Sequence, residues 1–330
     1  MIRCVVESRE EAMTERSKDQ LSLADALVQQ RAGQNERLGR IKALIDWAPV
    51  DRLLKPLRSD LGAPGYPVGV LMRALLLQQW YALSDPELEE ALADRLSFRR
   101  FVGLALDEAV PDHSTLWRFR EALGRAGLAE QVFGEINRQL AAKGMLVKQG
   151  TLIDATLVAA QSAPPPFAGD KPAHDRDAAW TKREGSSKKH FGYKAHLAVD
   201  QGSLLVRRAL LTAANINDTE PADALIQGDE AAVYADKAYD SHARSARLKD
   251  AGIKNRIMRR GNKHHALPPR QRQRNQLIAK VRAAVETVFA VFKRSYGYRR
   301  VRYFGLARNQ TQLALLCTAF NMRRALVLTG

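Results

Sequence analysis

Cysteine is scarce in this chain of 330 residues, with only Cys4 and Cys317, far apart in the sequence. Two such cysteines provide neither a disulfide framework nor the ligand spacing of a zinc site, and they fit a reducing cytoplasm. No run of about 18 apolar residues occurs, which excludes a membrane-spanning helix. The opening MIRCVVESREEAMTER holds no apolar stretch long enough for a signal peptide. We therefore expect a cytoplasmic protein that does not enter a membrane.

Acidic residues are scarce in the second half of the chain. Residues 1–150 contain 21 Lys or Arg and 21 Asp or Glu, whereas residues 151–330 contain 31 and 15 and carry the whole net charge of +16. This half predicts a surface for a polyanion, and duplex nucleic acid carries a negative charge about every 1.7 Å of its axis. Charge alone leaves solubility or attraction to a membrane surface open as an alternative.

Within the most basic stretch, residues 254–302, fifteen Lys or Arg accompany a single acid, Glu286. A carboxylate without a metal ion would repel a phosphate there, whereas a carboxylate that binds a divalent cation places a positive charge beside the phosphate. Arg282 and Lys293 project within about 40° of Glu286 on a helix with roughly 100° per residue. The alternative is an ordinary Arg–Glu pair on a solvated helix face.

The sequence pattern of the chain changes after residue 144. Residues 1–37 are polar and predict an arm, and residues 38–144 repeat apolar residues at helical spacing and predict an all-α domain. Residues 145–330 alternate strand and helix patterns, which predicts an α/β domain with a mixed sheet. The expected helix caps are Ser84 and either Ser114 or Thr115.

The elements expected in the α/β domain frame its candidate site. They include a strand at 146–160, a loop at 161–192, a hairpin formed by 193–200 and 204–213, and one long helix at 275–297. Alternation of this kind is common among α/β proteins, so it fixes no function by itself.

Three carboxylates are the candidates for chemistry. Asp154 lies in the middle of the apolar strand TLIDATLV, where an unpaired charge costs several kcal/mol, and Asp236 ends the apolar run AAVYAD, where ligands of α/β sheets bind. With Glu286 they can converge on two Mg²⁺ ions, which prefer oxygen ligands and stabilise an in-line phosphoryl displacement. The alternatives are an outward-facing Asp154 and a capping Asp236, and Asp200 and Asp240 are weaker rivals because turns favour Asp.

Basic and aromatic residues around these acids are the candidates for DNA contacts. Arg282 and Lys293 are expected to hold phosphates and orient the scissile group. Two loops add aromatic residues that can stack on bases and basic residues that can contact phosphates. The alternatives are that Trp180 anchors the first loop to the core and that the second loop is a solvated basic segment. The candidates in these loops are Trp180, Lys182, Lys188, Lys189, Lys194, Arg259, Arg260, Arg270, Arg272 and Arg274.

The order and spacing of these segments resemble the DDE transposases of bacterial insertion sequences, specifically the IS5 family within the wider IS4-like group. The resemblance runs from about Leu21 to Leu328, and no single motif carries it. The matching segments are IDW (45–47), LLLQQWYALSDPELEEALADRLSFRRFVGL (75–104), VPDHSTLWRFR (110–120), GTLIDATLV (150–158), W-T-K (180–182), HFGYKAHLAVD (190–200), ADKAYDS (235–241) and R-x₃-E-x₆-K (282–293).

The resemblance implies a ribonuclease H-like fold for the catalytic domain, residues 145–330. It places the catalytic, metal-binding triad on Asp154, Asp236 and Glu286, with two Mg²⁺ per active site and Mn²⁺ as a substitute.

The family signature Tyr-x₂-Arg-x₃-Glu-x₆-Lys is matched by Arg282, Glu286 and Lys293. Its Tyr position holds Ala279, a departure that leaves the role of that Tyr unfilled in this chain.

The implied activity is that of a transposase that binds the terminal inverted repeats of its own element. Mg²⁺-dependent hydrolysis would expose a 3′-hydroxyl, which then attacks target DNA. Because two ends must meet, we expect at least a dimer on double-stranded DNA. The alternatives are a ribonuclease H-like nuclease without strand transfer and a catalytically dead DNA-binding repressor.

The helical domain, residues 38–144, is expected to serve end recognition and dimer contacts. The segment STLWRFREAL also fits the second helix of a helix-turn-helix with Arg118 and Arg120 toward DNA. Against that interpretation, the first half carries no net charge, and Trp117 and Phe119 are expected in the core.

Overall fold

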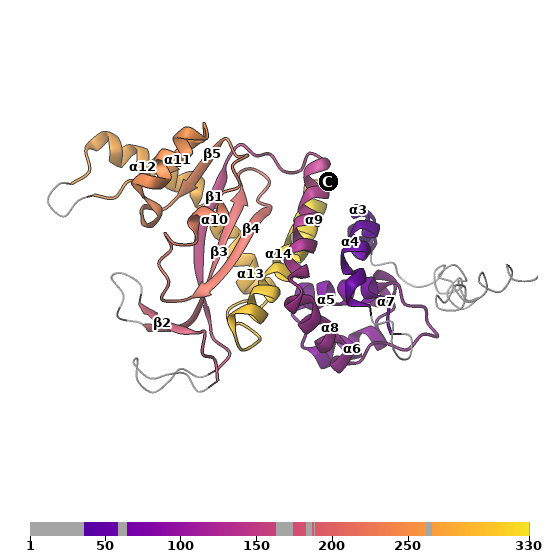
Figure 1. Cartoon of the computed structure of the whole chain (residues 1–330). Helices are drawn as coiled ribbons and strands as arrows, with labels where there is room; N and C mark the ends of the chain where they lie inside the picture. Colours follow the sequence, from indigo (N-terminus) through magenta and orange to yellow (C-terminus); the bar gives the residue numbers. More distant parts are fainter. Residues whose placement is uncertain are drawn as a thin grey trace, which may run out of the picture. The chain divides into compact units, whose positions relative to one another are not determined.

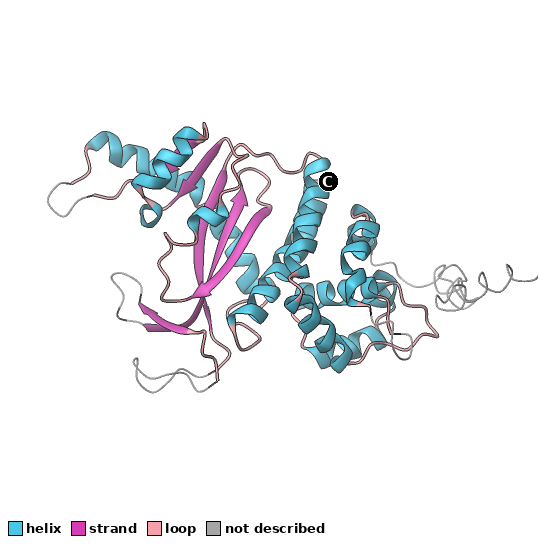
Figure 2. Cartoon of the chain, viewed as in Figure 1, coloured by secondary structure: helices cyan, strands magenta, loops and turns pink. Residues whose placement is uncertain are grey.

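The computed structural model of the chain describes residues 36–58, 65–162, 174–182, 187, 189–261 and 266–329. Their packing forms two compact units (Figure 1, Figure 2). One contains the described residues before 79 together with 83–122, and the other contains 79–82 and the described residues from 123 onward. The expected polar arm, residues 1–37, lies almost wholly outside the described residues. None of the described helices combines the length and apolarity needed to span a membrane.

The first unit is all-helical, as the apolar spacing predicted. Its helix α5 (Val68–Tyr81) is apolar around its circumference, and Met72, Leu75 and Leu77 are fully buried. A helix of this kind has to be surrounded by other elements. The other helices are α3 (Glu36–Leu44), α4 (Trp47–Leu54), the 3₁₀ turn η1 (Lys55–Leu57), α6 (Asp85–Asp94), α7 (Leu96–Val102) and α8 (His113–Arg125).

The two predicted helix caps had different outcomes. Ser84 caps α6 as predicted, in a capping box in which its hydroxyl accepts from the Glu87 N–H and the Glu87 carboxylate accepts from the Ser84 N–H. The prediction of Ser114 or Thr115 for α8 is wrong, because Asp112 precedes that helix and its carboxylate accepts from the Thr115 N–H at 2.6 Å.

Helix α8 corrects two further expectations. Trp117 is 46 % exposed rather than buried, while Phe119 is buried as predicted. Arg120 is also buried and forms a bidentate ion pair with Asp85 at 2.7 Å. The helix-turn-helix interpretation is therefore wrong in pointing Arg120 toward DNA.

The second unit is built around a six-stranded mixed sheet, which confirms the predicted fold class. The strand order is β2-β3-β1-β5-β6, and β4 also pairs with β3. Strand β1 is antiparallel to β3 and parallel to β5, and β5 is parallel to β6. The strands are β1 (Thr151–Ala159), β2 (Ala179–Lys182), β3 (Lys189–Asp200), β4 (Val206–Ala213), β5 (Ala232–Ala235) and β6 (Lys254–Ile257).

Helices and turns pack around this sheet. Helices α9 and α14 lie side by side (Figure 1), and α14 also packs against β4. Helix α11 packs on β6, α12 on β5 and α13 on β1. The elements are α9 (Leu128–Ala142), α10 (Ala222–Leu225), the 3₁₀ turn η2 (Lys237–Tyr239), α11 (His242–Asp250), α12 (Pro269–Arg282), α13 (Ala284–Ser295) and α14 (Leu306–Leu328).

Side chains of β1 alternate between the two faces of the sheet. Ile153 packs in an apolar cluster with residues of α10, η2 and α11. Asp154 and Thr156 face the opposite side, where α13 packs on β1. A half-buried carboxylate therefore stands on the face covered by the basic helices.

Helix α9 falls within the second unit, although the sequence grouped it with the helical domain, residues 38–144. The amide of Asn137 on α9 donates to the carbonyl of Val206 at 3.1 Å and accepts from the Asn321 amide at 2.7 Å. These buried bonds join α9 to β4 and α14.

A short strand replaces part of the loop expected at 161–192. Residues 179–182 form β2 and pair with β3, and Trp180 stands opposite Phe191 with ring centroids 5.5 Å apart. The prediction of a loop is wrong here, because the free edge of β3 offers backbone partners that the Pro-rich sequence does not reveal.

The long helix expected at 275–297 is divided into α12 and α13. The interruption falls at Ala283, which keeps right-handed helical dihedrals (φ −52°, ψ −23°). The Glu286 N–H then bonds to the Ala283 carbonyl, a tighter i to i+3 contact. The chain therefore tightens immediately before Glu286.

Candidate active site

Asp154 is the most buried of the three candidate acids, with its side chain 20 % exposed. Its Oδ2 accepts a hydrogen bond from Nη1 of Arg282 at 2.8 Å. Burial raises the pKa of Asp154 to about 6; Arg282 opposes that rise, and the charges of Asp236 and Glu286 add to it. The three acids therefore share one electrostatic environment.

The register of the parallel strands explains why Asp236 lies beside Asp154. Thr151 and Leu152 of β1 pair with Val233 and Tyr234 of β5. Continuing that register two residues past Leu152 brings Asp154 level with Asp236, which directly follows β5. The two carboxylates thus lie just beyond the last paired residues of β1 and β5.

Asp236 also caps η2, since its Oδ1 accepts from the Lys237 N–H at 2.6 Å. The capping interpretation of Asp236 is confirmed, and a cap uses one carboxylate oxygen and leaves the other for a ligand. The catalytic role of Asp236 stays a prediction.

The turn after Asp236, residues 237–240, is fixed by two buried or half-buried donors. The hydroxyl of Thr219 donates to the carbonyl of residue 238 at 2.5 Å. The guanidinium of Arg244 donates to the carbonyls of residue 239 at 2.5 Å and of Thr219 at 2.8 Å. Arg244 is only 2 % exposed and also pairs with Asp223. These contacts fix the backbone that carries Asp236.

Glu286 lies in the first turn of α13 and is exposed. An apolar stripe lies beside it, since Val285, Val288 and Phe292 are fully buried. The helix therefore packs along one edge and presents Glu286 along the next.

Lys293 reaches the same strand as Arg282. Its Nζ donates to the hydroxyl of Thr156 at 2.6 Å, and Thr156 stands on the same face of β1 as Asp154. The basic residues of the signature thus contact alternate residues of β1.

The acids suit a hard divalent cation chemically, because all their donor atoms are carboxylate oxygens. In the described residues, however, no three His, Cys, Asp or Glu side chains form a group that could hold a metal ion. The guanidinium of Arg282 bonds one oxygen of Asp154. Binding of a cation by all three acids therefore requires side-chain movement.

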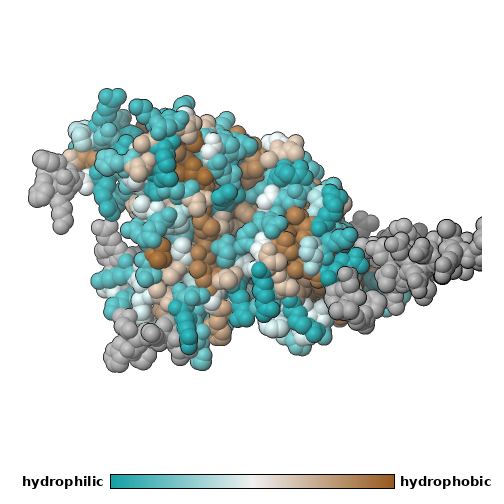
Figure 3. Space-filling model, in the orientation of Figure 1, coloured by the Kyte–Doolittle hydropathy of each residue, from teal (hydrophilic) through white to brown (hydrophobic). Residues whose placement is uncertain are grey.

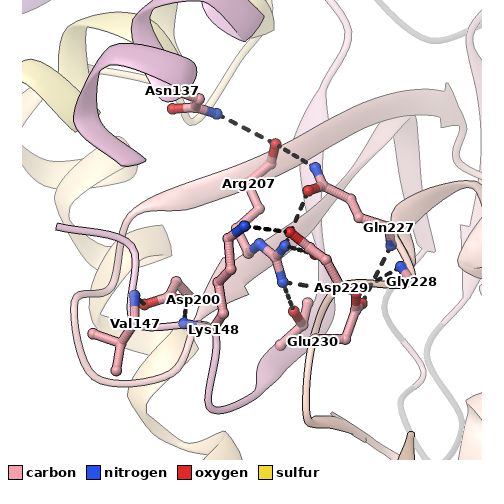
Figure 4. A network of polar contacts seen from close by, with 10 residues as sticks. Asn137, Val147, Lys148, Asp200, Arg207, Gln227, Gly228, Asp229 and Glu230 are labelled. Carbon is pink, nitrogen blue, oxygen red and sulfur yellow. Dashed lines mark hydrogen bonds and ion pairs between the residues drawn. The ribbon is translucent and has the colours of Figure 1, made fainter. Parts of the chain in front are cut away.

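The rival Asp200 has a structural role. It is fully buried and accepts from the backbone N–H groups of Val147 and Lys148 and from the hydroxyl of Ser203 (Figure 4). Asp200 therefore joins the chain entering β1 to the turn that leaves β3.

Figure 4 also shows Arg207 at the centre of a polar network. Its guanidinium pairs with Asp229 and donates to Gln227 at 3.0 Å and to the Thr151 hydroxyl at 2.6 Å. Thr151 begins β1 and Asp229 precedes β5, so this network holds the two parallel strands at the ends away from Asp154 and Asp236.

The second rival, Asp240, pairs with Arg259 at 2.8 Å. Arg259 was a predicted DNA contact, and this ion pair instead ties the turn after β5 to the strand end after β6.

Two other predicted DNA contacts are also engaged within the protein. Lys194 pairs with Asp218 at 2.8 Å and donates to the Ile216 carbonyl at 2.7 Å. Arg274 donates to the carbonyls of residues 255 and 257.

The remaining candidates differ in exposure. Trp180 is half-buried, and Lys188 lies outside the described residues. The candidates that are exposed are Lys182, Lys189, Arg260, Arg270 and Arg272.

His196 stands apart from the acids. It pairs in register with Ala155, so its side chain lies on the sheet face opposite Asp154. Burial lowers its pKa to about 4, and Nε2 lies 2.9 Å from the Thr212 hydroxyl. His196 is thus a packed strand residue.

Reading the sequence missed Thr156, Thr219 and Arg244. Thr156 had a weak signal, since it lies two residues after Asp154 on one strand face. Thr219 and Arg244 act through distant backbone carbonyls, for which the sequence contains no pattern.

Comparison with protein families gives two matches. A model described as a transposase DDE domain matches residues 146–322, and one described as a transposase domain (DUF772) matches residues 26–122. The first match spans more than half of the chain and includes all three candidate acids. No solved structure matches the chain.

Proposed function

The chain belongs to the DDE transposases, enzymes of DNA transposition that act by phosphoryl transfer, and we propose that it moves its own insertion sequence. In this proposal it binds the terminal inverted repeats and cleaves at the ends of the element. The 3′-hydroxyl released there then attacks target DNA. We propose that the chain belongs to the IS5 family, a proposal supported by the match of Arg282, Glu286 and Lys293 to its signature.

The observation that supports this most is the shared environment of the acids. Asp154 and Asp236 lie just beyond the last paired residues of β1 and β5, and the charge of Glu286 reaches Asp154. The family match spans all three.

We propose that these three acids hold two Mg²⁺, with Mn²⁺ as a substitute. Divalent cations at such a site supply charge stabilisation to the attacking and leaving oxygens. The carboxylates hold the cations in place, and Arg282, once withdrawn from Asp154, is free to bind a phosphate of the DNA. Lys293 stays against Thr156 and keeps α13 aligned with β1.

Two ends of the element must meet for a transposition event, so we propose at least a dimer with two-fold symmetry on DNA. The first unit supplies end recognition and dimer contacts in this proposal.

The deciding experiment incubates the wild-type protein and Mg²⁺ with a labelled duplex that carries the element's own end, beside a target duplex. Covalently joined products support the transposase. Cleavage without joining favours the nuclease without strand transfer, and tight end binding without any cleavage favours a repressor.

A loss of metal affinity is expected when the turn after Asp236 is released. Thr219→Val and Arg244→Gln remove donors that fix this turn, and loss of such supporting bonds typically weakens metal binding about 10- to 100-fold. The measurement is a Mn²⁺ titration followed by electron paramagnetic resonance.

The matched control is Arg247→Ala. Arg247 pairs with the same Asp223 as Arg244 does, but its side chain is 60 % exposed and forms no bond to the turn. Equal Mn²⁺ affinity in the wild type and Thr219→Val would contradict the positioning role.

A further inference from the structure

Helix α12 is basic and leads directly into the helix of Glu286. It contains five Lys or Arg and no acid in 14 residues. One residue, Ala283, separates it from α13. Its position next to the acids and its charge set it apart from the other described helices.

One face of α12 is used by the protein itself. Ile278 is 3 % exposed, Asn275 bonds to the backbone of Arg259, and Arg274 bonds to carbonyls of β6. Arg282 pairs with Asp154 at the end of the same face. These contacts dock α12 on the sheet edge and fix which side points outward.

The opposite side, here called the outer face of α12, is exposed, and none of its side chains contacts the described residues through a hydrogen bond or ion pair. Leu277 is 60 % exposed, which no packing in the described chain explains. In Figure 3 the region that α12 occupies in Figure 1 is covered mainly by hydrophilic residues. The outer face consists of Arg270, Arg272, Gln273, Gln276, Leu277 and Lys280.

The chemistry of the outer face matches duplex DNA. The major groove admits an α-helix, Gln forms bidentate bonds with adenine, and apolar side chains contact the thymine methyl group. Arg272, Arg270 and Lys280 supply cations for phosphates, and the absence of acids on α12 removes repulsion. A helix face that is only solvated does not need an exposed Leu277, and it does not need to lack acidic residues.

The outer face lies close to the acids along the chain. Gln276 precedes Glu286 by only 10 residues, and Ala283 alone separates α12 from α13. A helix of 14 residues is about 21 Å long, which corresponds to roughly six base pairs at 3.4 Å each.

We propose that the outer face of α12 enters the major groove of the element's end and reads base pairs within about six of the cleaved bond. Gln273 and Gln276 contact base edges, Leu277 covers a thymine methyl group, and Arg270 and Arg272 bind flanking phosphates. This inference rests on the proposed function, and it assigns part of the end specificity to the catalytic unit.

The test is a binding selection without divalent cations, so it needs no cleavage. A duplex pool carries the element's end with the ten terminal base pairs randomised, and the bound fraction is sequenced. We compare the wild type with the double variant Gln273→Ala/Gln276→Ala. The matched control is Gln131→Ala, an exposed Gln on α9.

The wild type and Gln131→Ala should enrich defined base pairs at one or more positions within six of the end. The Gln double variant should lose about tenfold of that enrichment, in line with loss of a bidentate base contact. Arg270→Ala/Arg272→Ala should instead weaken binding to all sequences alike and reduce the salt slope by about one for each phosphate contact.

Unchanged enrichment in the Gln double variant, or no enrichment near the end in the wild type, would overturn the inference. Unchanged affinity in the Arg double variant would also overturn it, since the outer face would then serve a partner other than DNA. A wild type that selects these sequences but never cuts them would contradict the proposed function and leave the inference standing.

Discussion

Glu286→Ala is expected to lower Mg²⁺-dependent cleavage by on the order of 10³-fold or more, equivalent to about 4 kcal/mol of transition-state stabilisation. The exposed carboxylate is the only acid in the stretch 254–302, so no neighbour in that stretch can replace it as a ligand. Binding of the element's end should change little, because removing an acid leaves the cations of α12 in place. Gel assays of cleavage and of end binding, carried out on the same preparation, measure both quantities.

A suitable control is Glu130→Ala. Glu130 occupies the first turn of α9 as Glu286 occupies the first turn of α13, so both variants lose the same favourable contact with a helix N-terminus. Glu130→Ala should cleave like the wild type. If Glu286→Ala retained more than about a tenth of the wild-type cleavage, Glu286 would not be a metal ligand. Joined products from wild type alone would link the loss to transposition chemistry.

The sheet was predictable because its strands carry local signals. Apolar runs marked β1 and β5, and a turn sequence marked the β3–β4 hairpin. Strand β2 carried no such signal, since it exists through pairing with β3. The exposure of Trp117 on an amphipathic helix was also not predictable, because the sequence does not show which neighbouring elements cover each side of that helix.

The candidate acids were predictable because each violates its local context. Asp154 is charged within an apolar strand, Asp236 ends one, and Glu286 is the only acid in a basic stretch. Their supports were not predictable, since Thr219 and Arg244 bind backbone carbonyls whose location depends on the finished fold. The contact between Arg282 and Asp154 depends on the fold in the same way, as 127 residues lie between them.

The Arg282–Asp154 contact also gives the metal-free site a defined state. The pair has side chains 17 % and 20 % exposed, so both charges are largely removed from water. Such pairs often contribute little net stability, because the loss of hydration offsets the attraction between the charges. We therefore expect the metal-free site to lower the free energy of unfolding of the protein.

Asp154→Asn should increase the free energy of unfolding at pH 8 in the absence of divalent cations. The pKa of Asp154 is raised from 3.8 to about 6, chiefly by burial, so the folded protein binds more protons than the unfolded chain between these values. The contribution of the Asp154 carboxyl group to stability is then largest below about pH 4, falls as the pH rises to about 6, and is constant above. A shift of this size corresponds to at most about 3 kcal/mol, and it already includes the opposing effect of Arg282 on the pKa of Asp154.

Urea unfolding at pH 4, 6 and 8 in EDTA measures this difference, and the gain of Asp154→Asn should shrink as the pH falls. Asp250→Asn, which changes an exposed acid on α11, should show no such pH dependence. A variant less stable than the wild type at pH 8, or a gain equal at all three pH values, would contradict the prediction. Added Mg²⁺ should stabilise the wild type and not Asp154→Asn, because a ligand that binds only the folded state stabilises it in proportion to its occupancy. If the metal-free site destabilises the protein and cation binding reverses that effect, the half-buried carboxylate of β1 is linked to metal binding and so to the chemistry of DNA transfer.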